Sequence, residues 1–207
     1  MLVSTPLRLG TLASHGGSSL RAIVAAIRAG ELDAEARLVI SNNADCPAVQ
    51  FAKSEGLAWR HISATSAGGL DAADAAIAAA LAQAGAELVV LSGYMRKLGP
   101  KTLARFNNRI LNVHPALLPS YGGRGFYGRR VHEAVAAAGD LTSGASIHLV
   151  DSDYDTGPVI ARQSVPLEPG DTAEAIERKV TAIEPALFVA TLRRIAQGDI
   201  VLPERIG

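Results

Sequence analysis

Leu88-Val89-Val90-Leu91 is an uninterrupted apolar run in the middle of the chain. A strand reads in this way when helices cover both faces of a parallel sheet, because neither face then meets water. Further strands are expected at 7–13, 36–41 and 109–113, and segments with helical periodicity separate them. Strands that alternate with helices predict a single α/β domain, built on a mostly parallel twisted sheet flanked by helices, with a Rossmann-like N-terminal half.

The other elements follow from the same periodicities. In the first helix Leu20, Ile23, Val24 and Ile27 recur at i, i+3, i+4 and i+7, and Gly30 is placed to end it. Further helices are expected at about 47–55, 71–84, 101–106 and 129–138, and further strands at 58–62, 146–150 and 159–165.

The last helix carries two local signals. It is expected to open at Asp171–Glu174 with a capping box. Pro185 lies inside its periodic pattern and is expected either to kink the helix or to start a second one, because proline has no N–H to donate.

The composition excludes several classes of protein. The chain has 207 residues, of which 48% are hydrophobic and 19% charged, so it is not a disordered chain and fits one domain at 1–207. Lys plus Arg and Asp plus Glu both number 20, so the net charge favours neither nucleic acid nor an anionic membrane. The N-terminus does not read as a signal peptide, no apolar stretch approaches the roughly 18 residues of a membrane span, and Cys46 has no second cysteine. A cytoplasmic protein that acts on small molecules, as a monomer or a homodimer, is expected.

Asn112 and His114 are the first candidates for chemistry. They stand at i and i+2 where the strand 109–113 ends, so an extended backbone puts both side chains on one face. Pro115 then favours an extended His114 and prevents the strand from continuing normally. An amide that can hold a developing oxyanion, beside an imidazole that can move a proton, suits acyl transfer. A purely structural histidine at a strand end is the alternative.

An acidic loop lies further along the chain, between two apolar strands. Asp155 in this loop is the carboxylate that we expect to pair with His114, fixing its tautomer and stabilising its charged form. The alternation of Asp151, Asp153 and Asp155 weakly resembles a calcium loop, but the glycine and glutamate of an EF-hand are not in register. No zinc motif occurs either, so no metal site is predicted.

The loop Ser14–Ser19 follows a strand and opens a helix. Its small residues let backbone N–H groups approach an anion, and the helix dipole favours a phosphate there. The loop is neither a Walker loop nor a G-x-G-x-x-G fingerprint, so binding of a nucleoside triphosphate or a dinucleotide is weakly supported. On residue types alone, a plain strand-to-helix turn with a serine cap is an equally good interpretation.

Four motifs stand out: Gly17-Ser18-Ser19-Leu20, Gly93-Tyr94-Met95-Arg96-Lys97-Leu98, Asn112-Val113-His114-Pro115-Ala116-Leu117-Leu118-Pro119 and Asp155-Thr156-Gly157-Pro158. Together they resemble the glycinamide ribonucleotide formyltransferases, a branch of the folate-dependent formyltransferase family, over nearly the whole chain. The resemblance implies transfer of a formyl group from 10-formyltetrahydrofolate to glycinamide ribonucleotide in purine biosynthesis, with Asn112, His114 and Asp155 as catalytic residues. It also implies a phosphate-binding half at about 7–100 and a folate-binding and catalytic half at about 101–200.

The same resemblance implies two groups of binding residues. Those for the ribonucleotide acceptor are Gly17, Ser18, Ser19 and Glu184. Those for the folate are Met95, Arg96, Lys97, Leu98, Asn112, Val150, Asp151 and Asp155. His148 is similar to a family histidine near the site and reads as a pocket residue or a packed strand histidine, whereas His61 and His132 read as surface or packing residues.

Two positions depart from the family pattern. Ser19 stands where the family more often has asparagine, and Gly69-Leu70 stands where it tends to have Ser-Arg. A cation directed at the phosphate is therefore missing. Our hypothesis is that His15 or Arg124 supplies the replacement charge.

Other functions are weaker fits to this sequence. A methionyl-tRNA formyltransferase needs a further C-terminal domain and positive charge for tRNA, and a formyltetrahydrofolate hydrolase normally carries an N-terminal regulatory domain. Sugar-nucleotide formyltransferases fit the phosphate loop less well. The intact trio Asn112, His114 and Asp155 disfavours a folate-binding protein without turnover, and the missing dinucleotide fingerprint disfavours a Rossmann oxidoreductase.

Overall fold

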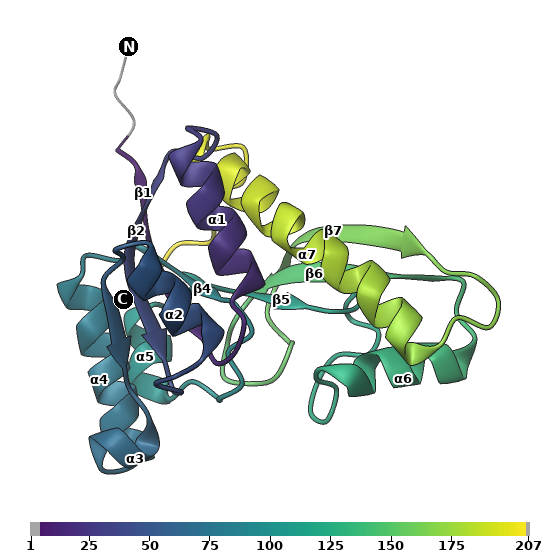
Figure 1. Ribbon diagram of the computed structural model, residues 1–207, viewed down its shortest axis with the longest axis horizontal. Helices are drawn as coiled ribbons and strands as arrows, with labels where there is room; N and C mark the ends of the chain where they lie inside the picture. Colours follow the sequence, from purple (N-terminus) through teal and green to yellow (C-terminus); the bar gives the residue numbers. More distant parts are fainter. Residues whose placement is uncertain (1–4, 206–207) are drawn as a thin grey trace.

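The computed structural model describes residues 5–205 and shows one seven-stranded sheet with helices on both faces (Figure 1). The strand order is β3-β2-β1-β4-β5-β6-β7. The strands are β1 Leu7–Ala13, β2 Ala34–Ser41, β3 Trp59–His61, β4 Leu88–Leu91, β5 Ile110–His114, β6 Thr142–Leu149 and β7 Val159–Pro166. Strands β1 to β5 pair in parallel, whereas β6 is antiparallel to β5 and β7 to β6. The predicted mostly parallel α/β sheet is confirmed.

The helices cover both faces of this sheet. In the described range they are α1 Ser18–Arg28, α2 Pro47–Ser54, α3 Ala64–Ala67, α4 Leu70–Gln83, α5 Pro100–Arg105, α6 Arg129–Ala138 and α7 Ala173–Ala196. Helices α1, α2 and α7 pack on one face, and α4 and α5 on the other (Figure 1). Helix α6 packs against α7 beyond the edge of the parallel strands.

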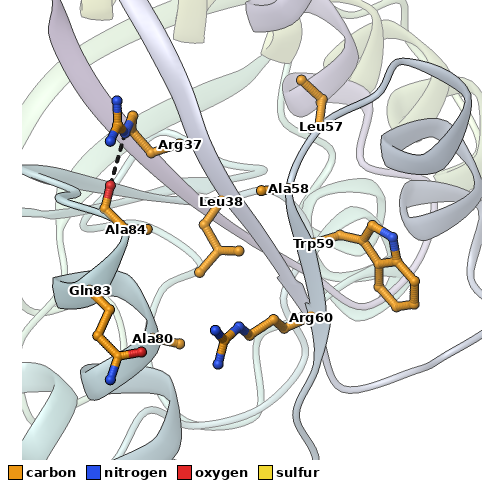
Figure 2. Close-up of a pocket in the computed structure, with 9 residues that line it drawn as sticks. All are labelled: Arg37, Leu38, Leu57, Ala58, Trp59, Arg60, Ala80, Gln83 and Ala84. Carbon is orange, nitrogen blue, oxygen red and sulfur yellow. Dashed lines mark hydrogen bonds between the residues drawn. The ribbon is translucent and has the colours of Figure 1, made fainter.

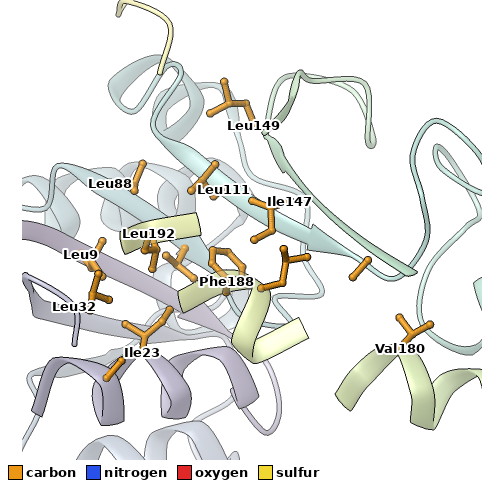
Figure 3. Close-up of a cluster of buried hydrophobic side chains, with 14 of the residues drawn as sticks. Leu9, Ile23, Leu32, Leu88, Leu111, Ile147, Leu149, Val180, Phe188 and Leu192 are labelled. Atoms are coloured by element: carbon orange, nitrogen blue, oxygen red, sulfur yellow. The ribbon is translucent and has the colours of Figure 1, made fainter. Parts of the chain in front are cut away.

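The largest apolar cluster lies between the sheet and the helices α1 and α7 (Figure 3). Phe188 and Leu192 of α7 meet Ile23 of α1, Leu111 of β5 and Ile147 of β6, and all five side chains are fully buried. Full burial of each such side chain contributes about 1.5–3 kcal/mol. This cluster therefore fixes α7 across the sheet, beside the strand ends where the candidate residues lie.

Helix α7 departs from two local expectations. It runs unbroken through Pro185, which excludes a second helix, one of the two alternatives expected at this proline. Proline removes one backbone hydrogen bond, but the next turn is anchored by Phe188 in the core, which holds the helix together. Thr172 is the N-cap and accepts a hydrogen bond from the N–H of Ala175. The expected capping box is absent because Ala175, three residues after the N-cap, has no polar side chain to bond back to the N-cap N–H.

Two other elements differ from the expected boundaries. Strand β6 begins at Thr142, four residues earlier than expected. Gly144 lies in this added part, and a Cβ there would collide with the carbonyl oxygen of Gln163 on β7, so the close strand pairing requires a glycine that the pattern did not favour. Helix α3 was not expected, because a single turn capped by Ser63 is too short to show helical periodicity.

The chain leaves β5 in a defined direction. After His114 and Pro115, the N–H of Leu118 donates to Ser146 Oγ at 3.0 Å, and that hydroxyl donates to the carbonyl oxygen of Ala116 at 2.7 Å. All three groups are buried, so the turn is tied to β6 directly beside the end of β5. The carboxyl ends of β1, β4 and β5 meet at this edge because the strands are parallel.

Candidate active site

A cavity of about 1000 Å³ opens at the carboxyl edge of the parallel strands. Loops that follow β1, β4 and β5 line it on one side, and α6 and α7 line it on the other. Its volume is at the upper end of the range for small-molecule sites. Sequence-predicted residues in its lining are Gly17, Ser18, Ser19, Met95, Arg96, Lys97, Asn112, His114, Asp155 and Glu184.

His114 ends β5 and is only 3% exposed, at the cavity wall. Its Nε2 lies 2.7 Å from the carbonyl oxygen of Tyr121. A carbonyl oxygen only accepts, so Nε2 carries the hydrogen and Nδ1 of the neutral ring is left as the proton acceptor. Burial lowers the pKa of His114 below its ordinary value, and the nearby carboxylate of Asp155 opposes that effect. The ring is therefore a neutral base near pH 7, with Nδ1 as its working nitrogen.

Asp155 has a left-handed backbone with φ of 58°, which aspartate adopts more readily than most residues. Its Oδ2 lies 3.4 Å from His114 Nδ1 and accepts from the N–H of Gly123 at 3.0 Å. Burial acts to raise the pKa of Asp155, but the neighbouring His114 and the Gly123 N–H hold it below its ordinary value. The expected contact of this carboxylate with His114 is present, and the carboxylate is ionised.

Asp155 also contacts a second histidine. Its Oδ1 lies 3.4 Å from Nε2 of His148, and Nδ2 of Asn112 lies 3.1 Å from the same ring nitrogen. The other ring nitrogen of His148, Nδ1, lies 2.9 Å from the carbonyl oxygen of Leu149. Asn112, His114, His148 and Asp155 thus form one connected cluster on β5, β6 and the acidic loop.

The loop that opens α1 lines another part of the cavity. Gly17 is the N-cap, in a left-handed conformation with φ of 64° that glycine adopts at little cost. The N–H of Leu20 donates to Ser92 Oγ at 3.1 Å, whereas the N–H groups of Ser18 and Ser19 donate to no acceptor within residues 5–205. Two unpaired N–H groups at the positive end of a helix can receive an anion.

The family model described as formyl transferase matches residues 7–192. This chain belongs to the formyl transferase family. The resemblance carried by the four motifs is therefore confirmed at the level of the family, and the α/β fold agrees with it.

Known formyl transferases are similar to this chain over most of its length. The phosphoribosylglycinamide formyltransferase of Mycobacterium tuberculosis is 37% identical over 203 residues, which cover 98% of this chain and 91% of that relative. The crystal structure of glycinamide ribonucleotide transformylase 1 from Symbiobacterium toebii matches with a TM-score of 0.88 and 33% identity, covering 97% of this chain and 92% of that one. The chloroplastic phosphoribosylglycinamide formyltransferase of Vigna unguiculata is 33% identical over 94% of this chain, which spans 62% of that relative's length.

The α6–α7 wall of this formyl transferase cavity carries acidic groups. Burial raises the pKa of Glu184 to about 7, and the charge of Glu177 adds to the rise.

His132 on α6 also lines the cavity, is 2% exposed and has an Nδ1 with no hydrogen-bond partner among the described residues. Its burial fits the packing interpretation, but nothing in the sequence pattern indicated that it reaches the cavity.

Basic side chains line the same cavity as the loop that opens α1. His15 and Arg124 both line the cavity, as the hypothesis of a replacement charge requires, whereas Leu70 is 81% exposed and outside the lining. Sequence reasoning missed Arg21, which also lines the cavity and donates through Nε to the carbonyl oxygen of Gly16 at 3.2 Å. Its position in the first turn of α1 could have indicated it, because residues three apart on a helix are neighbours.

The residues implied to bind folate fall into two groups. The first group lines the cavity, and its members that follow β4 are Met95, Arg96 and Lys97. Those outside the cavity lining are Leu98, Val150 and Asp151. Leu98 is buried in the core on the α4 face of the sheet, and Asp151 accepts from Thr156 Oγ1 at 2.8 Å within its own loop. Neither side chain lines the cavity.

A second concavity of about 560 Å³ lies beside the amino end of β3 and the carboxyl end of α4 (Figure 2). Its lining residues are Arg37, Leu38, Leu57, Ala58, Trp59, Arg60, Ala80, Gln83 and Ala84. The guanidinium of Arg37 donates through Nε to the carbonyl oxygen of Ala84 at 2.9 Å. This lining holds no carboxylate, imidazole or hydroxyl, so it offers no general base or nucleophile.

Metal-binding clusters and membrane-spanning helices are both absent from residues 5–205. Within residues 5–205, no group of three or more His, Cys, Asp or Glu side chains is placed to hold a metal ion. No helix in the part of the chain that the structure describes is long and apolar enough to cross a membrane. Cys46 is buried and is the chain's only cysteine.

Proposed function

We propose that this chain transfers a formyl group from 10-formyltetrahydrofolate to the amine of glycinamide ribonucleotide in purine biosynthesis. One observation carries the proposal: Asn112, a neutral His114 and an ionised Asp155 meet in a cavity that also contains the free N–H groups of Ser18 and Ser19. Relatives named for this activity, at 37% identity and nearly full coverage, support it. A cytoplasmic location accords with a single buried thiol that has no disulfide partner.

In the proposed reaction the substrate amine attacks the formyl carbon and creates a tetrahedral intermediate with a negatively charged oxygen. The amide of Asn112 donates to that oxygen. The amine then loses a proton, and the folate nitrogen gains one as the carbon–nitrogen bond to folate breaks. His114 carries this proton on Nδ1, because its Nε2 is held by Tyr121. No covalent enzyme intermediate is needed, since the substrate amine is the nucleophile.

Asp155 acts on His114 through its charge. A proton on Nδ1 would face Oδ2 of Asp155 at 3.4 Å, so the carboxylate stabilises the imidazolium that forms during the transfer. The rest of the cavity positions the two substrates, which supplies much of the rate. In this proposal the Gly17 loop receives the phosphate, Glu184 contacts the acceptor, and the residues after β4 bind the folate.

Steady-state assays with purified protein and 10-formyltetrahydrofolate test this function. The acceptors compared are glycinamide ribonucleotide, water and an amino-sugar nucleotide. The proposal expects formyl transfer to the ribonucleotide to exceed both other reactions by at least about 10²-fold, because only the ribonucleotide combines the reactive amine with a terminal phosphate monoester. Hydrolysis as the fastest reaction would identify a deformylase, and tight folate binding without turnover would identify a binding protein.

Gly17→Val should raise the KM for the ribonucleotide acceptor by about tenfold or more, and should change the KM for the folate donor little. The new side chain would block the approach of an anion to the N–H groups of Ser18 and Ser19. It would also meet Ala48 at 3.0 Å in a left-handed backbone that valine disfavours. The measurement is the pair of KM values, taken from initial rates.

Gly30→Val is the matched control for this variant. Gly30 has φ of 70° at the other end of the same helix, and a Cβ there would meet nothing within 4 Å. Both variants carry the same type of backbone strain, so both should lose stability by on the order of 1–2 kcal/mol. A Gly17→Val enzyme with a normal acceptor KM would exclude the loop as the phosphate site.

Glu184→Gln should stabilise the protein above pH 7. The Glu184 pKa is 4.5 when unfolded and about 7 when folded, so the folded state binds more protons between these values and stability falls as pH rises through this window. The shift corresponds to roughly 3 kcal/mol, which partial exposure in the cavity reduces. The free energy of unfolding at pH 8 should therefore be higher for the variant by about 1–3 kcal/mol, with little difference at pH 4.

Denaturant unfolding at pH 4 and pH 8 measures this effect. Glu168→Gln, at an exposed position on the loop before α7, is the control for loss of a carboxylate without burial. Parallel pH profiles for the parent and Glu184→Gln would show that the carboxyl group of Glu184 keeps its ordinary pKa in the folded state.

A further inference from the structure

His148 faces Asn112 across the antiparallel pair of β5 and β6, where the two residues are direct partners in register. Its ring is 2% exposed. In the proposed reaction, Asn112 donates a hydrogen bond to the oxyanion. The orientation of its amide group determines whether the amide nitrogen, a donor, or the amide oxygen, an acceptor, faces that oxyanion. The hydrogen bonds of His148 decide this orientation.

The tautomer of His148 follows from its backbone contact. Nδ1 lies 2.9 Å from the carbonyl oxygen of Leu149, which can only accept, so Nδ1 carries a hydrogen. In the opposite neutral tautomer, two lone pairs would face each other at that distance in a buried site. The neutral ring therefore presents a lone pair at Nε2.

A lone pair at Nε2 requires a donor opposite it. The amide group of Asn112 lies 3.1 Å away, so the atom that faces the ring must be Nδ2 with one of its two hydrogens. Oδ1 of Asn112 must then point away from His148. The second hydrogen of Nδ2 is left free for a group in the cavity that Asn112 lines.

We infer that His148 is a positioning residue. It accepts a hydrogen bond from one N–H of the Asn112 amide and thereby orients the other N–H towards the oxyanion. This inference rests on the proposed formyl transfer for its catalytic consequence, but the hydrogen-bond arrangement itself does not depend on the substrate. His148 touches neither substrate in this account. It prevents Asn112 from turning its amide and presenting an oxygen, which would repel the oxyanion.

Asp155 is the group that competes with this arrangement. Its Oδ1 lies 3.4 Å from Nε2, longer than the 3.1 Å contact from Asn112. If His148 were doubly protonated, Nε2 would donate to that carboxylate, and Asn112 would turn its Oδ1 towards the ring. The amide orientation therefore distinguishes a neutral from a charged His148.

Nitrogen NMR of the parent protein tests the arrangement without any substrate. Long-range proton–nitrogen spectra at pH 7.5 should show Nδ1 of His148 as the protonated nitrogen and Nε2 as the unprotonated one. His148→Gln identifies the signals and should leave the other histidines unchanged. A protonated Nε2, in either the neutral or the charged ring, would overturn the inference whatever the enzyme catalyses.

Two variants test the catalytic consequence. His148→Phe keeps a flat ring but removes the acceptor, and should lower kcat by at least about tenfold while both KM values stay within about threefold. His148→Gln can still accept from Asn112 through its side-chain oxygen, and should keep kcat within about fivefold of the parent. A structural role alone would move stability and KM in both variants, so thermal unfolding is measured alongside.

A double-mutant cycle with Asn112→Ala completes the test. If His148 acts only through Asn112, adding His148→Phe to Asn112→Ala should lower kcat no further, within about threefold. Fully additive losses, or a folded His148→Gln enzyme as slow as His148→Phe, would overturn the positioning role. A parent protein that forms no formylated product at all would instead refute the proposed function and leave the NMR result standing by itself.

Discussion

Replacing His114 with alanine should lower kcat by about 10²–10⁴-fold, because the variant loses the group that carries the proton from the amine to the folate nitrogen. His114 is buried at the cavity wall, and its Nε2 bond to Tyr121 leaves Nδ1 as the only ring nitrogen available for that transfer. Folate affinity should stay within a few-fold, since binding is assigned to the residues after β4. Turnover is measured under saturating donor and acceptor, and affinity by equilibrium binding.

His61→Ala is the control for this variant. His61 is exposed on the edge strand β3, with only a 3.3 Å contact from its Nε2 to the carbonyl oxygen of Asn42. Its loss should leave kcat unchanged. A His114→Ala enzyme with turnover within threefold of the parent would remove His114 from the mechanism.

Asp155→Asn should lower kcat by about 10²–10³-fold, the usual effect of removing one preorganised electrostatic group. Asparagine has the same size and tolerates the left-handed backbone at this position, so the loop can keep its shape. The substitution removes the negative charge that lies 3.4 Å from both His114 and His148. Initial rates across pH 5–9 measure both the size of the effect and its pH dependence.

The pH profile of Asp155→Asn has a definite direction. The carboxylate raises the pKa of His114 against the larger lowering by burial, so its loss should lower that pKa further. The limb of the profile that reports His114 should therefore move to lower pH, although the site titrates as a coupled group. Asp153→Asn, in the same loop but exposed and outside the cavity lining, is the control and should show neither change. An unchanged rate and profile for Asp155→Asn would exclude the carboxylate from the chemistry.

The fold could be predicted where burial imposes a clear pattern. The apolar run at 88–91 is fully buried as β4, and parallel strands bring its end beside His114. The predicted ends of strands and helices were wrong where a local backbone preference competes with burial. Gly144 lies before the predicted start of this strand but within β6, because the close approach of β7 requires a glycine there. Pro185 was expected either to kink the helix or to start a second one, and it lies within α7 with no second helix, because core packing outweighs one lost hydrogen bond.

The site could be predicted in part. Asn112 and His114 were readable because they share one strand, and their spacing fixes one face. The contact of Asp155 with His114 was expected from the sequence. The contacts of His148 with Asn112 and Asp155 depend on which antiparallel strand follows and on the shape of a loop, and a residue pattern specifies neither. His132 reaches the cavity from a helix whose pattern looks ordinary, so only the packed structure reveals it, whereas the place of Arg21 in the first turn of α1 was a usable signal.

Isotope tracing of the formyl group tests the central claim most directly. The protein is incubated with 10-formyltetrahydrofolate labelled with ¹³C in the formyl carbon and with unlabelled glycinamide ribonucleotide, and both products are followed by mass spectrometry. Our account predicts one labelled formyl group on the ribonucleotide amine for each tetrahydrofolate released, and loss of that product in the His114→Ala protein. Label recovered as free formate, with the ribonucleotide unchanged, would contradict it.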